Sequence, residues 1–154
     1  MNIVSVDSRN KLIYLNLCQS YEGEFSALTE KLPNTDGVFK LDTILGVNIE
    51  GFLLYEKEIP IGLAAVRKSI EDFFEVCEFY VIPSCRKKDL GRKFAHHLFS
   101  IFKGQWQVKQ IEGAEYATTF WRKVIGEFTS GEFEEDVYMD FHWGKVTRQR
   151  FTSV

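Results

Sequence analysis

The sequence predicts a single α/β domain over residues 1–154, built on a mixed sheet that is mostly antiparallel. Three runs rich in β-branched and aromatic residues follow one another with short polar connectors, which is typical of antiparallel hairpins. The stretch 73–111 then has the pattern strand, helix, strand, and such a crossover makes its two strands parallel neighbours. With 45% hydrophobic residues, a chain of this length can bury one core.

The first half of the chain predicts one helix, a turn and three strands. Asp7 and Ser8 are residue types that cap helices, and apolar residues recur after them near the helical period. That stripe comprises Leu12, Leu15, Cys18, Tyr21 or Glu22, and Phe25. The residues 34–37, Asn-Thr-Asp-Gly, predict a turn. Strands are expected at 49–55, 59–67 and 73–82.

The second half alternates helices and strands. An amphipathic helix should end at Gly104, and its apolar stripe is Leu90, Phe94, Ala95, Leu98, Ile101 and Phe102. A strand is expected at 106–111. A further helix should end at Gly126, with the stripe Ala117, Phe120, Trp121, Val124 and Ile125. Last, Val137, Met139, Phe141 and Trp143 alternate with polar residues, which predicts a strand whose apolar side is buried.

The composition excludes several classes of protein. A net charge of -3 gives no whole-molecule field that would attract nucleic acid or an anionic membrane. Cys18, Cys77 and Cys85 form no Cys-x-x-Cys pair, so neither a disulfide framework nor a zinc ribbon is indicated. No secretory signal and no apolar run of spanning length is present. We expect a cytoplasmic protein with no metal and no nucleic-acid or membrane partner, while the oligomeric state, a homodimer included, stays open.

The stretch 81–95 carries the chemical signal. A strand breaks at Pro83, and a basic turn then opens a helix. Free backbone N–H groups at a helix start attract anions such as phosphate. The nearby cations are Arg86, Lys87, Lys88, Arg92 and Lys93. These residues alone favour a solvated basic turn that only caps the helix, with an anion site as the alternative.

Two motifs in this sequence resemble one family. Val81-x-Pro83 followed by Arg86, Lys88 and Gly91 resembles the acyl-CoA loop of the GNAT superfamily of N-acyltransferases. Downstream, 106–108 and 117–125 resemble the late strand of that family and its Ala-x-x-Phe-Trp helix. The resemblance implies a GNAT-like sheet with helices on both faces. It also implies an N-acetyltransferase that uses acetyl-CoA and a primary amine, which attacks the thioester directly in a ternary complex.

The resemblance also implies which residues bind the co-substrate. The backbone at 79–81 would pair with the pantetheine arm, and the loop amides would hold the pyrophosphate. The implied cofactor-binding residues are Phe79, Tyr80, Val81, Arg86, Lys87, Lys88, Asp89, Leu90, Gly91, Arg92, Phe120 and Trp121.

Three positions depart from the family pattern. Asp89 stands where the first loop glycine is usual, and Ala114 stands where an asparagine is common. Trp121 replaces a tyrosine thought to protonate the departing CoA sulfur, and an indole N–H is no substitute for that acid. Tyr116 and Tyr80 are the alternative proton donors. These departures keep a second hypothesis open, a catalytically weak domain of the same fold that binds CoA or a protein partner.

An amine acceptor has to lose a proton before it attacks, so the reaction needs a base. Glu75 and Glu78 lie on the strand that enters the loop, and a spacing of three puts them on opposite faces of the sheet. We favour Glu78, which is nearer the loop and begins a Glu-Phe-Tyr-Val run that resembles the family strand; a solvent-facing glutamate is the alternative for either. The predicted catalytic residues are therefore Glu78, Glu75 and Tyr116. Residues 12–47 and 127–137 are expected to form the acceptor region.

Overall fold

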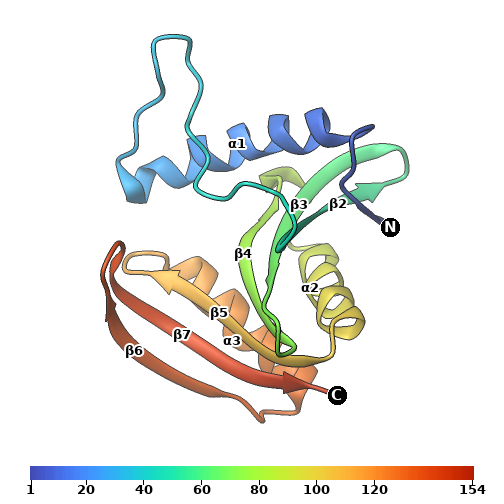
Figure 1. Ribbon diagram of the computed structural model, residues 1–154, viewed down its shortest axis with the longest axis vertical. Coiled ribbons are helices and arrows are strands. Elements are labelled where there is room, and N and C mark those ends of the chain that lie inside the picture. Colours follow the sequence, from blue (N-terminus) through green and yellow to red (C-terminus); the bar gives the residue numbers. More distant parts are fainter. The chain divides into compact units, whose positions relative to one another are not determined.

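The computed structural model describes residues 1–154 and contains seven strands and three α-helices (Figure 1). The strands form one sheet with the order β1-β2-β3-β4-β5-β7-β6. In chain order the elements are β1 (Asn2–Ser5), α1 (Lys11–Thr29), β2 (Ile49–Glu56), β3 (Ile59–Lys68), β4 (Phe73–Val81), a 3₁₀ turn (Pro83–Cys85), α2 (Leu90–Ile101), β5 (Gly104–Ile111), α3 (Glu115–Thr129), β6 (Glu134–Asp140) and β7 (Gly144–Ser153).

The sheet is mixed and mostly antiparallel, as the sequence predicts. β1 is antiparallel to β2, and β7 is antiparallel to both β5 and β6. The short connectors that join β2, β3 and β4, which are neighbours in the sheet, leave only antiparallel pairing open to them. β4 and β5 are parallel, with Phe73 opposite Gln105 and Glu75 opposite Gln107. The α2 crossover therefore produces the predicted parallel pair.

The chain divides into two compact units. Unit 1 comprises Met1–Val66 and Cys77–Gly91, and unit 2 comprises Arg67–Val76 and Arg92–Val154. β4 contributes to both, since its first residues pair with β5 and its last ones pack in unit 1. The single domain over 1–154 stays a prediction. None of the helices is long and apolar enough to span a membrane.

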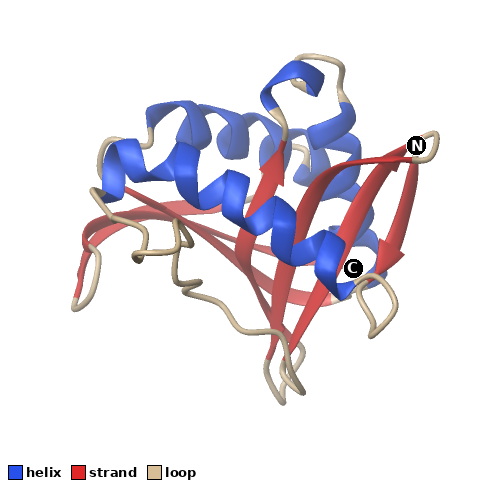
Figure 2. Ribbon diagram, turned by 90° about the horizontal axis from the view of Figure 1, so that it is seen from above, coloured by secondary structure: helices blue, strands red, loops and turns tan.

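In unit 1, α1 packs along the strands (Figure 2). The helix begins at Lys11 after the cap residue Asn10, so the expectation that Asp7 or Ser8 caps it is wrong. The reason is local. The Asn10 side chain accepts a hydrogen bond from the Asp7 N–H at 2.8 Å and donates one to the Ser5 carbonyl at 3.1 Å, which closes a turn before the helix starts.

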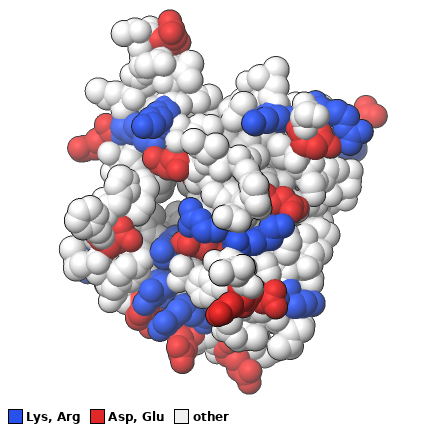
Figure 3. Space-filling view, in the orientation of Figure 1, with Lys and Arg blue, Asp and Glu red and all other residues white.

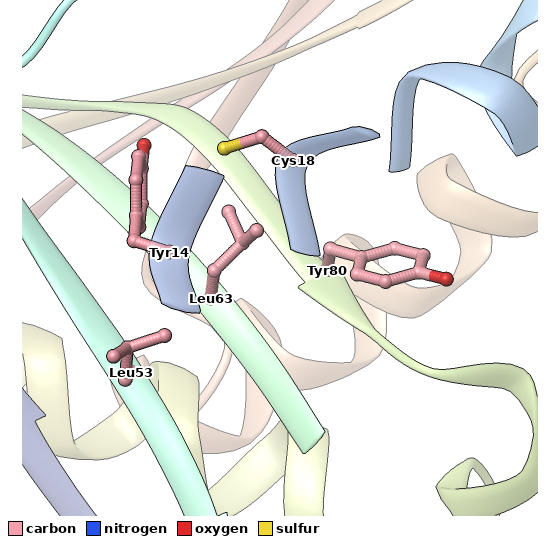
Figure 4. Packing of buried hydrophobic residues seen from close by; sticks show 5 residues of the cluster. All are labelled: Tyr14, Cys18, Leu53, Leu63 and Tyr80. Carbon is pink, nitrogen blue, oxygen red and sulfur yellow. The ribbon is translucent and has the colours of Figure 1, made fainter. Parts of the chain in front are cut away.

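The predicted stripe of α1 is confirmed except at its start. Cys18 and Glu22 are buried and Leu15 and Tyr21 pack against the core, whereas Leu12 is 70% exposed and Tyr14 is buried in its place. Tyr14 and Cys18 belong to a core cluster with Leu53, Leu63 and Tyr80 (Figure 4). α1 therefore turns a partly polar face toward the sheet.

Unit 2 is organised around an aromatic core. The Phe99 ring of α2 lies 4.9 Å from Trp106, 5.2 Å from Phe128 and 4.7 Å from Phe151, measured between ring centroids. The predicted boundary at Gly104 is confirmed, since β5 begins there and a side chain at this position would collide with the Asp72 carbonyl. α2, β5, α3 and β7 all contribute rings to this core.

α3 does not end at Gly126 as expected. It continues to Thr129, and Ser130 closes it in the left-handed conformation with φ 54°. The carbonyl of Gly126 accepts the Gly131 N–H at 2.8 Å, which gives the terminus its cap. Gly126 lies inside the helix, and a side-chain carbon there would make an ordinary contact with the Phe133 ring. This glycine is therefore not a helix stop.

The prediction for the apolar side of the last strands is wrong as well. Val137 is 54%, Met139 75% and Phe141 108% exposed. β6 is an edge strand and ends at Asp140, so Phe141 lies in the following turn. The side of β6 that carries Tyr138 is the more buried one, because the Arg148 guanidinium lies 4.4 Å from the centre of the Tyr138 ring.

Charged side chains of both signs are interspersed on the face drawn in Figure 3. Much of this charge is locally paired. In unit 2, for example, Arg148 donates two hydrogen bonds to Asp136, at 3.0 and 2.6 Å, and Arg122 donates two to Glu135, at 2.8 and 2.7 Å. Such pairing fits the small net charge of the chain.

Two alanine substitutions test the assignment of core and surface in unit 2. We expect Phe99→Ala to lower the free energy of unfolding by about 3–5 kcal/mol, because it leaves a cavity among aromatic rings. Phe141→Ala should change it by less than about 0.5 kcal/mol. Urea unfolding followed by fluorescence measures both, and a comparable loss for the two variants would contradict the assignment.

Candidate functional site

The chemically distinctive group in unit 1 is the carboxyl of Glu78. It is partly buried on β4, and its Oε1 accepts a hydrogen bond of 2.7 Å from the Thr43 hydroxyl. Burial raises the pKa of Glu78 from its ordinary value of 4.5 to about 7, the hydrogen bonds from Thr43 and Tyr21 oppose the rise, and the charges of Glu22 and Asp42 add to it. A carboxyl with a pKa near neutrality can both accept and return a proton at physiological pH.

The segment that carries Thr43 is held in place by side chains of α1 and of its own first residues. No helix or strand occurs between 31 and 45. The Lys31 ammonium donates to Glu22 at 2.6 Å, to Asp42 at 3.0 Å and to the Lys40 carbonyl at 2.9 Å. The amide of Gln19 exchanges two hydrogen bonds of 2.8 Å with the backbone of Phe39. These contacts bring Thr43 to Glu78.

One more polar group of α1 interacts with the charge of Glu78. The Tyr14 side chain is 1% exposed, and its hydroxyl has no nitrogen or oxygen partner, only the Cys18 thiol. Tyr14, Thr43 and Lys31 are not among the predicted site residues. Thr43 and Glu78 are 35 residues apart, and irregular segments carry no periodicity that would predict such a contact. The available signal in the sequence is Glu22, a charged residue within the otherwise apolar stripe of the first helix.

The loop that follows β4 is anchored by Arg86. Its Nε donates to the Val81 carbonyl at 2.8 Å, and its two terminal nitrogens donate to the Glu24 carboxylate at 2.8 and 3.0 Å. The guanidinium also lies 5.6 Å from the centre of the Tyr80 ring. Arg86 therefore ties the loop to the end of β4 and to α1, and its predicted contact with a phosphate stays a prediction.

The backbone of this loop has the conformation that favours glycine. Lys87 has φ 67° and Asp89 has φ 61°, both in the left-handed region. Asparagine and aspartate tolerate this region better than most residues. Asp89 thus keeps the backbone shape of the glycine it replaces, although it adds a carboxylate. The side chains of Lys87, Lys88 and Asp89 are exposed, and α2 begins directly after them at Leu90.

The remaining residues predicted at the cofactor site are divided between the two units. In unit 1, Tyr80, Val81 and Leu90 are buried, and Phe79 and Gly91 are half-buried. In unit 2, Arg92 forms an ion pair of 3.8 Å with Glu127, and Trp121 is buried with its ring 6.3 Å from Phe99. The half-buried Phe120 packs its ring edge-on against Trp121 at 5.0 Å.

The other two predicted catalytic residues lie in unit 2. Glu75 forms ion pairs of 3.1 Å with Arg67 and with Lys109. Two cations on one carboxylate are typical of a charge network that stabilises a sheet. Tyr116 is 63% exposed in the first turn of α3. Glu78, Tyr80 and Arg86 thus belong to unit 1 and Glu75 and Tyr116 to unit 2, and their catalytic roles stay predictions.

No group of three or more His, Cys, Asp or Glu side chains is arranged to hold a metal ion, and none of the three cysteines forms a disulfide. His96 Nε2 lies 2.9 Å from the Val124 carbonyl, so it links α2 to α3.

Comparisons with known proteins place the fold. No protein-family model and no curated protein matches the sequence. Among solved structures, the ribosomal-protein-S18-alanine N-acetyltransferase of Escherichia coli has a TM-score of 0.66 at 12% identity, covering 99% of this chain and 93% of that one. An acetyltransferase of Bacillus subtilis in complex with CoA has a TM-score of 0.64 at 12% identity, covering 99% of both chains.

A third solved structure is that of an enzyme named for a different kind of acceptor. The aminoglycoside 6'-N-acetyltransferase of Enterococcus faecium has a TM-score of 0.61 at 13% identity and covers 100% of this chain and 98% of that one. At these identities the likeness concerns the fold alone. The chain has the fold of the GNAT acetyltransferases, which confirms the fold implied by the two sequence motifs.

The raised pKa of Glu78 predicts how stability depends on pH. A carboxyl whose pKa is higher in the folded than in the unfolded protein stabilises the fold below pH 4.5, and this contribution is lost as the pH rises through about 7. Between pH 4.5 and pH 8 we expect the wild type to lose roughly 2–3 kcal/mol relative to Glu78→Gln. Urea unfolding of both proteins across this range measures the difference, and parallel pH profiles would show that the pKa of Glu78 is not raised.

Proposed function

We propose that the protein is an N-acetyltransferase that transfers an acetyl group from acetyl-CoA to a primary amine. The observation that carries the proposal is Glu78, a carboxyl with a pKa near 7 on the strand that leads directly into the basic loop. Residues 79–81 separate the two features, a rise of roughly 10 Å along the strand. Base and loop are therefore held on one rigid element.

The loop residues suit the diphosphate of acetyl-CoA. The left-handed conformations of Lys87 and Asp89 precede the start of α2, a twelve-residue helix, and the N-terminal end of a helix attracts anions. Lys87 and Lys88 are exposed beside them. The carboxylate of Asp89 opposes binding by about 1 kcal/mol per unit charge at 4 Å in water, less than the cations contribute together. The amides of 86–92 would hold the diphosphate, and the backbone at 79–81 would hold the pantetheine arm.

The proposed reaction joins the amine nitrogen to the acetyl carbon and breaks the carbon–sulfur bond of the thioester. Acetyl-CoA supplies the activated acetyl group. Glu78 in its carboxylate form takes one proton from the acceptor ammonium, and the neutral amine then attacks directly in the ternary complex. When the tetrahedral adduct collapses, the nitrogen loses its second proton and the thiolate takes one up, so the proton on Glu78 is the one released to solvent. The thiolate has an ordinary pKa of about 8.5 and leaves without a strong acid. Tyr116 is the exposed hydroxyl proposed to return a proton to it.

The fold alone does not determine which amine is the acceptor. The solved structures that share it are named for an alanine of ribosomal protein S18 and for an aminoglycoside. In this chain Glu22, Asp42 and Glu78 surround the proposed reaction side, and Lys31 is the cation bonded to two of them. This charge balance supports a cationic acceptor.

A second function has one observation in its favour. Trp121, at the position where many GNAT enzymes have a tyrosine, is buried against Phe99 in the core of unit 2. Packing in this core accounts for the burial of Trp121. A catalytically weak protein of the same fold, which binds CoA or a protein partner, would show the same arrangement. Binding of acetyl-CoA without thiol release over a broad panel of primary amines would favour this function.

Co-substrate binding is tested with a charge reversal in the loop. We expect Lys88→Glu to weaken acetyl-CoA binding roughly tenfold or more, because it adds a negative charge close to the diphosphate. Lys103→Glu makes the same change outside the loop and should bind like the wild type. Isothermal titration calorimetry measures both. If the wild type gives no saturable heat, the proposed function is wrong. Arg86 is unsuitable for this test because it also anchors the loop.

Turnover is tested at Glu78. Glu78→Gln should lower kcat/KM for the amine by about 10²- to 10⁴-fold near pH 7, and it should leave the Kd of acetyl-CoA unchanged. The loss should shrink at high pH, where more of the acceptor is already neutral. A thiol-release assay across pH 6–9 measures it. Wild-type rates in the variant would exclude Glu78 as the base.

A further inference from the structure

The Tyr14 hydroxyl is the one buried side-chain nitrogen or oxygen that has no nitrogen or oxygen hydrogen-bond partner in the structure, and its hydrogen bond goes to the Cys18 thiol. A thiol is a weak hydrogen-bonding group, so the lone pairs of the Tyr14 oxygen receive no N–H or O–H donor. Native proteins pair nearly all buried polar groups, either internally or with a bound molecule. The tyrosine ring packs in the cluster with Leu53 and Leu63, a place that a phenylalanine would fill equally well. The hydroxyl oxygen therefore keeps an acceptor capacity that the core does not use.

The hydroxyl lies at the polar edge of this cluster. Figure 4 shows it pointing away from Leu53 and Leu63, on the side where the Cys18 sulfur lies. The ionisable groups that act on it are Cys18, Glu78 and Cys77. Burial raises the pKa of Tyr14 far above its ordinary value and raises the pKa of the Cys18 thiol to about 12. Both groups stay protonated at physiological pH, so Tyr14 acts as a neutral hydrogen-bonding group.

The helix that carries Tyr14 has polar groups on its buried side. α1 buries Tyr14, Cys18 and Glu22 at every fourth position, while apolar residues such as Leu15 and Leu17 pack beside them only partly buried. Polar side chains on the core side of a helix break the local rule for a core helix, and such breaks concentrate at functional sites. Glu78 of β4, which accepts the Thr43 hydrogen bond, is also hydrogen-bonded by Tyr21 of this helix.

We propose that the Tyr14 hydroxyl binds the nitrogen of the acceptor amine beside the Glu78 carboxyl. This inference rests on the proposed function and adds a second contact to the same site. A primary ammonium has three N–H donors. One N–H would donate to Glu78 and another to the Tyr14 oxygen, whose own proton would point to the weakly accepting Cys18 sulfur. After Glu78 takes its proton, the Tyr14 contact still holds the neutral amine.

The arrangement has a consequence for specificity. Two acceptors, Glu78 and Tyr14, require two N–H groups on one nitrogen. A tertiary ammonium of equal charge has a single N–H and satisfies one of them. The site would therefore discriminate primary from tertiary amines by hydrogen bonding, beyond the attraction of charge.

An acceptor reaches this place by replacing the Thr43 hydroxyl at Glu78. Thr43 belongs to the segment 31–45, which contains no helix or strand. One hydrogen bond of 2.7 Å joins it to the carboxyl. Displacement of this side chain breaks no strand pairing of the sheet.

The test titrates n-butylammonium chloride into the full-length protein, with sodium chloride of matched concentration as the blank. NMR follows the ¹³Cζ resonance of Tyr14 and the carboxyl resonance of Glu78. We expect both to move with one Kd, and N,N-dimethyl-n-butylammonium should bind more weakly. Tyr14→Phe should raise the Kd for n-butylammonium roughly threefold to tenfold, which corresponds to the loss of one hydrogen bond.

Stability and a matched variant separate binding from folding. Tyr14→Phe should change the urea midpoint little, because the buried hydroxyl that it removes has only the weakly accepting Cys18 sulfur as a partner. Tyr55→Phe, which removes the same atom from a tyrosine of β2 at the margin of the cluster, should leave the Kd unchanged. An unchanged Kd in Tyr14→Phe, or a Tyr14 resonance that does not move, would overturn the proposal.

These measurements use no acetyl-CoA, so they are independent of turnover. Joint movement of the two resonances without thiol release in the enzyme assay would support the amine site and refute the acetyltransferase. Thiol release with a Tyr14→Phe variant that binds n-butylammonium like the wild type would refute the role of Tyr14 and leave the acetyltransferase standing.

Discussion

The partial burial of one carboxyl, that of Glu78, is the constraint on which the proposed chemistry depends. A charge in this position is disfavoured by desolvation and by Glu22 and Asp42, and it is tolerated because Thr43 and Tyr21 offer hydrogen bonds. Neither influence dominates, which leaves the pKa near neutrality. The arrangement around α1 serves this balance, since Lys31 and Gln19 fix the segment that supplies Thr43.

The loop after β4 shows a second balance, between conformation and charge. Arg86 is bonded to the Val81 carbonyl and to Glu24, so the loop shape is set by contacts within unit 1. Lys87 and Asp89 adopt left-handed conformations that ordinary side chains disfavour. The carboxylate of Asp89 weakens the attraction of this loop for an anion. The left-handed backbone nevertheless keeps the direction of the loop amides.

Much of the fold could be predicted from the sequence because its elements have clear periods. The strands after Ile49, the crossover helix and the parallel pair of β4 and β5 all follow from alternation and from connector length. Alternation tells which residues share a side of a strand but not which side is covered, so the exposure of Met139 could not be read from it. The contact of Thr43 with Glu78 joins an irregular segment to a strand, and no periodic signal reports such a pair.

β4 and the segment 31–45 differ in how readily they accept insertions and substitutions. The carboxyl and the loop are on one strand, where a change of length would shift the register of both. Thr43 is on a stretch without ladder hydrogen bonds, where insertions and substitutions are tolerated more readily. Substitutions in that stretch can therefore change the proton affinity of Glu78 and the shape offered to the proposed acceptor, while the loop after β4 stays unchanged.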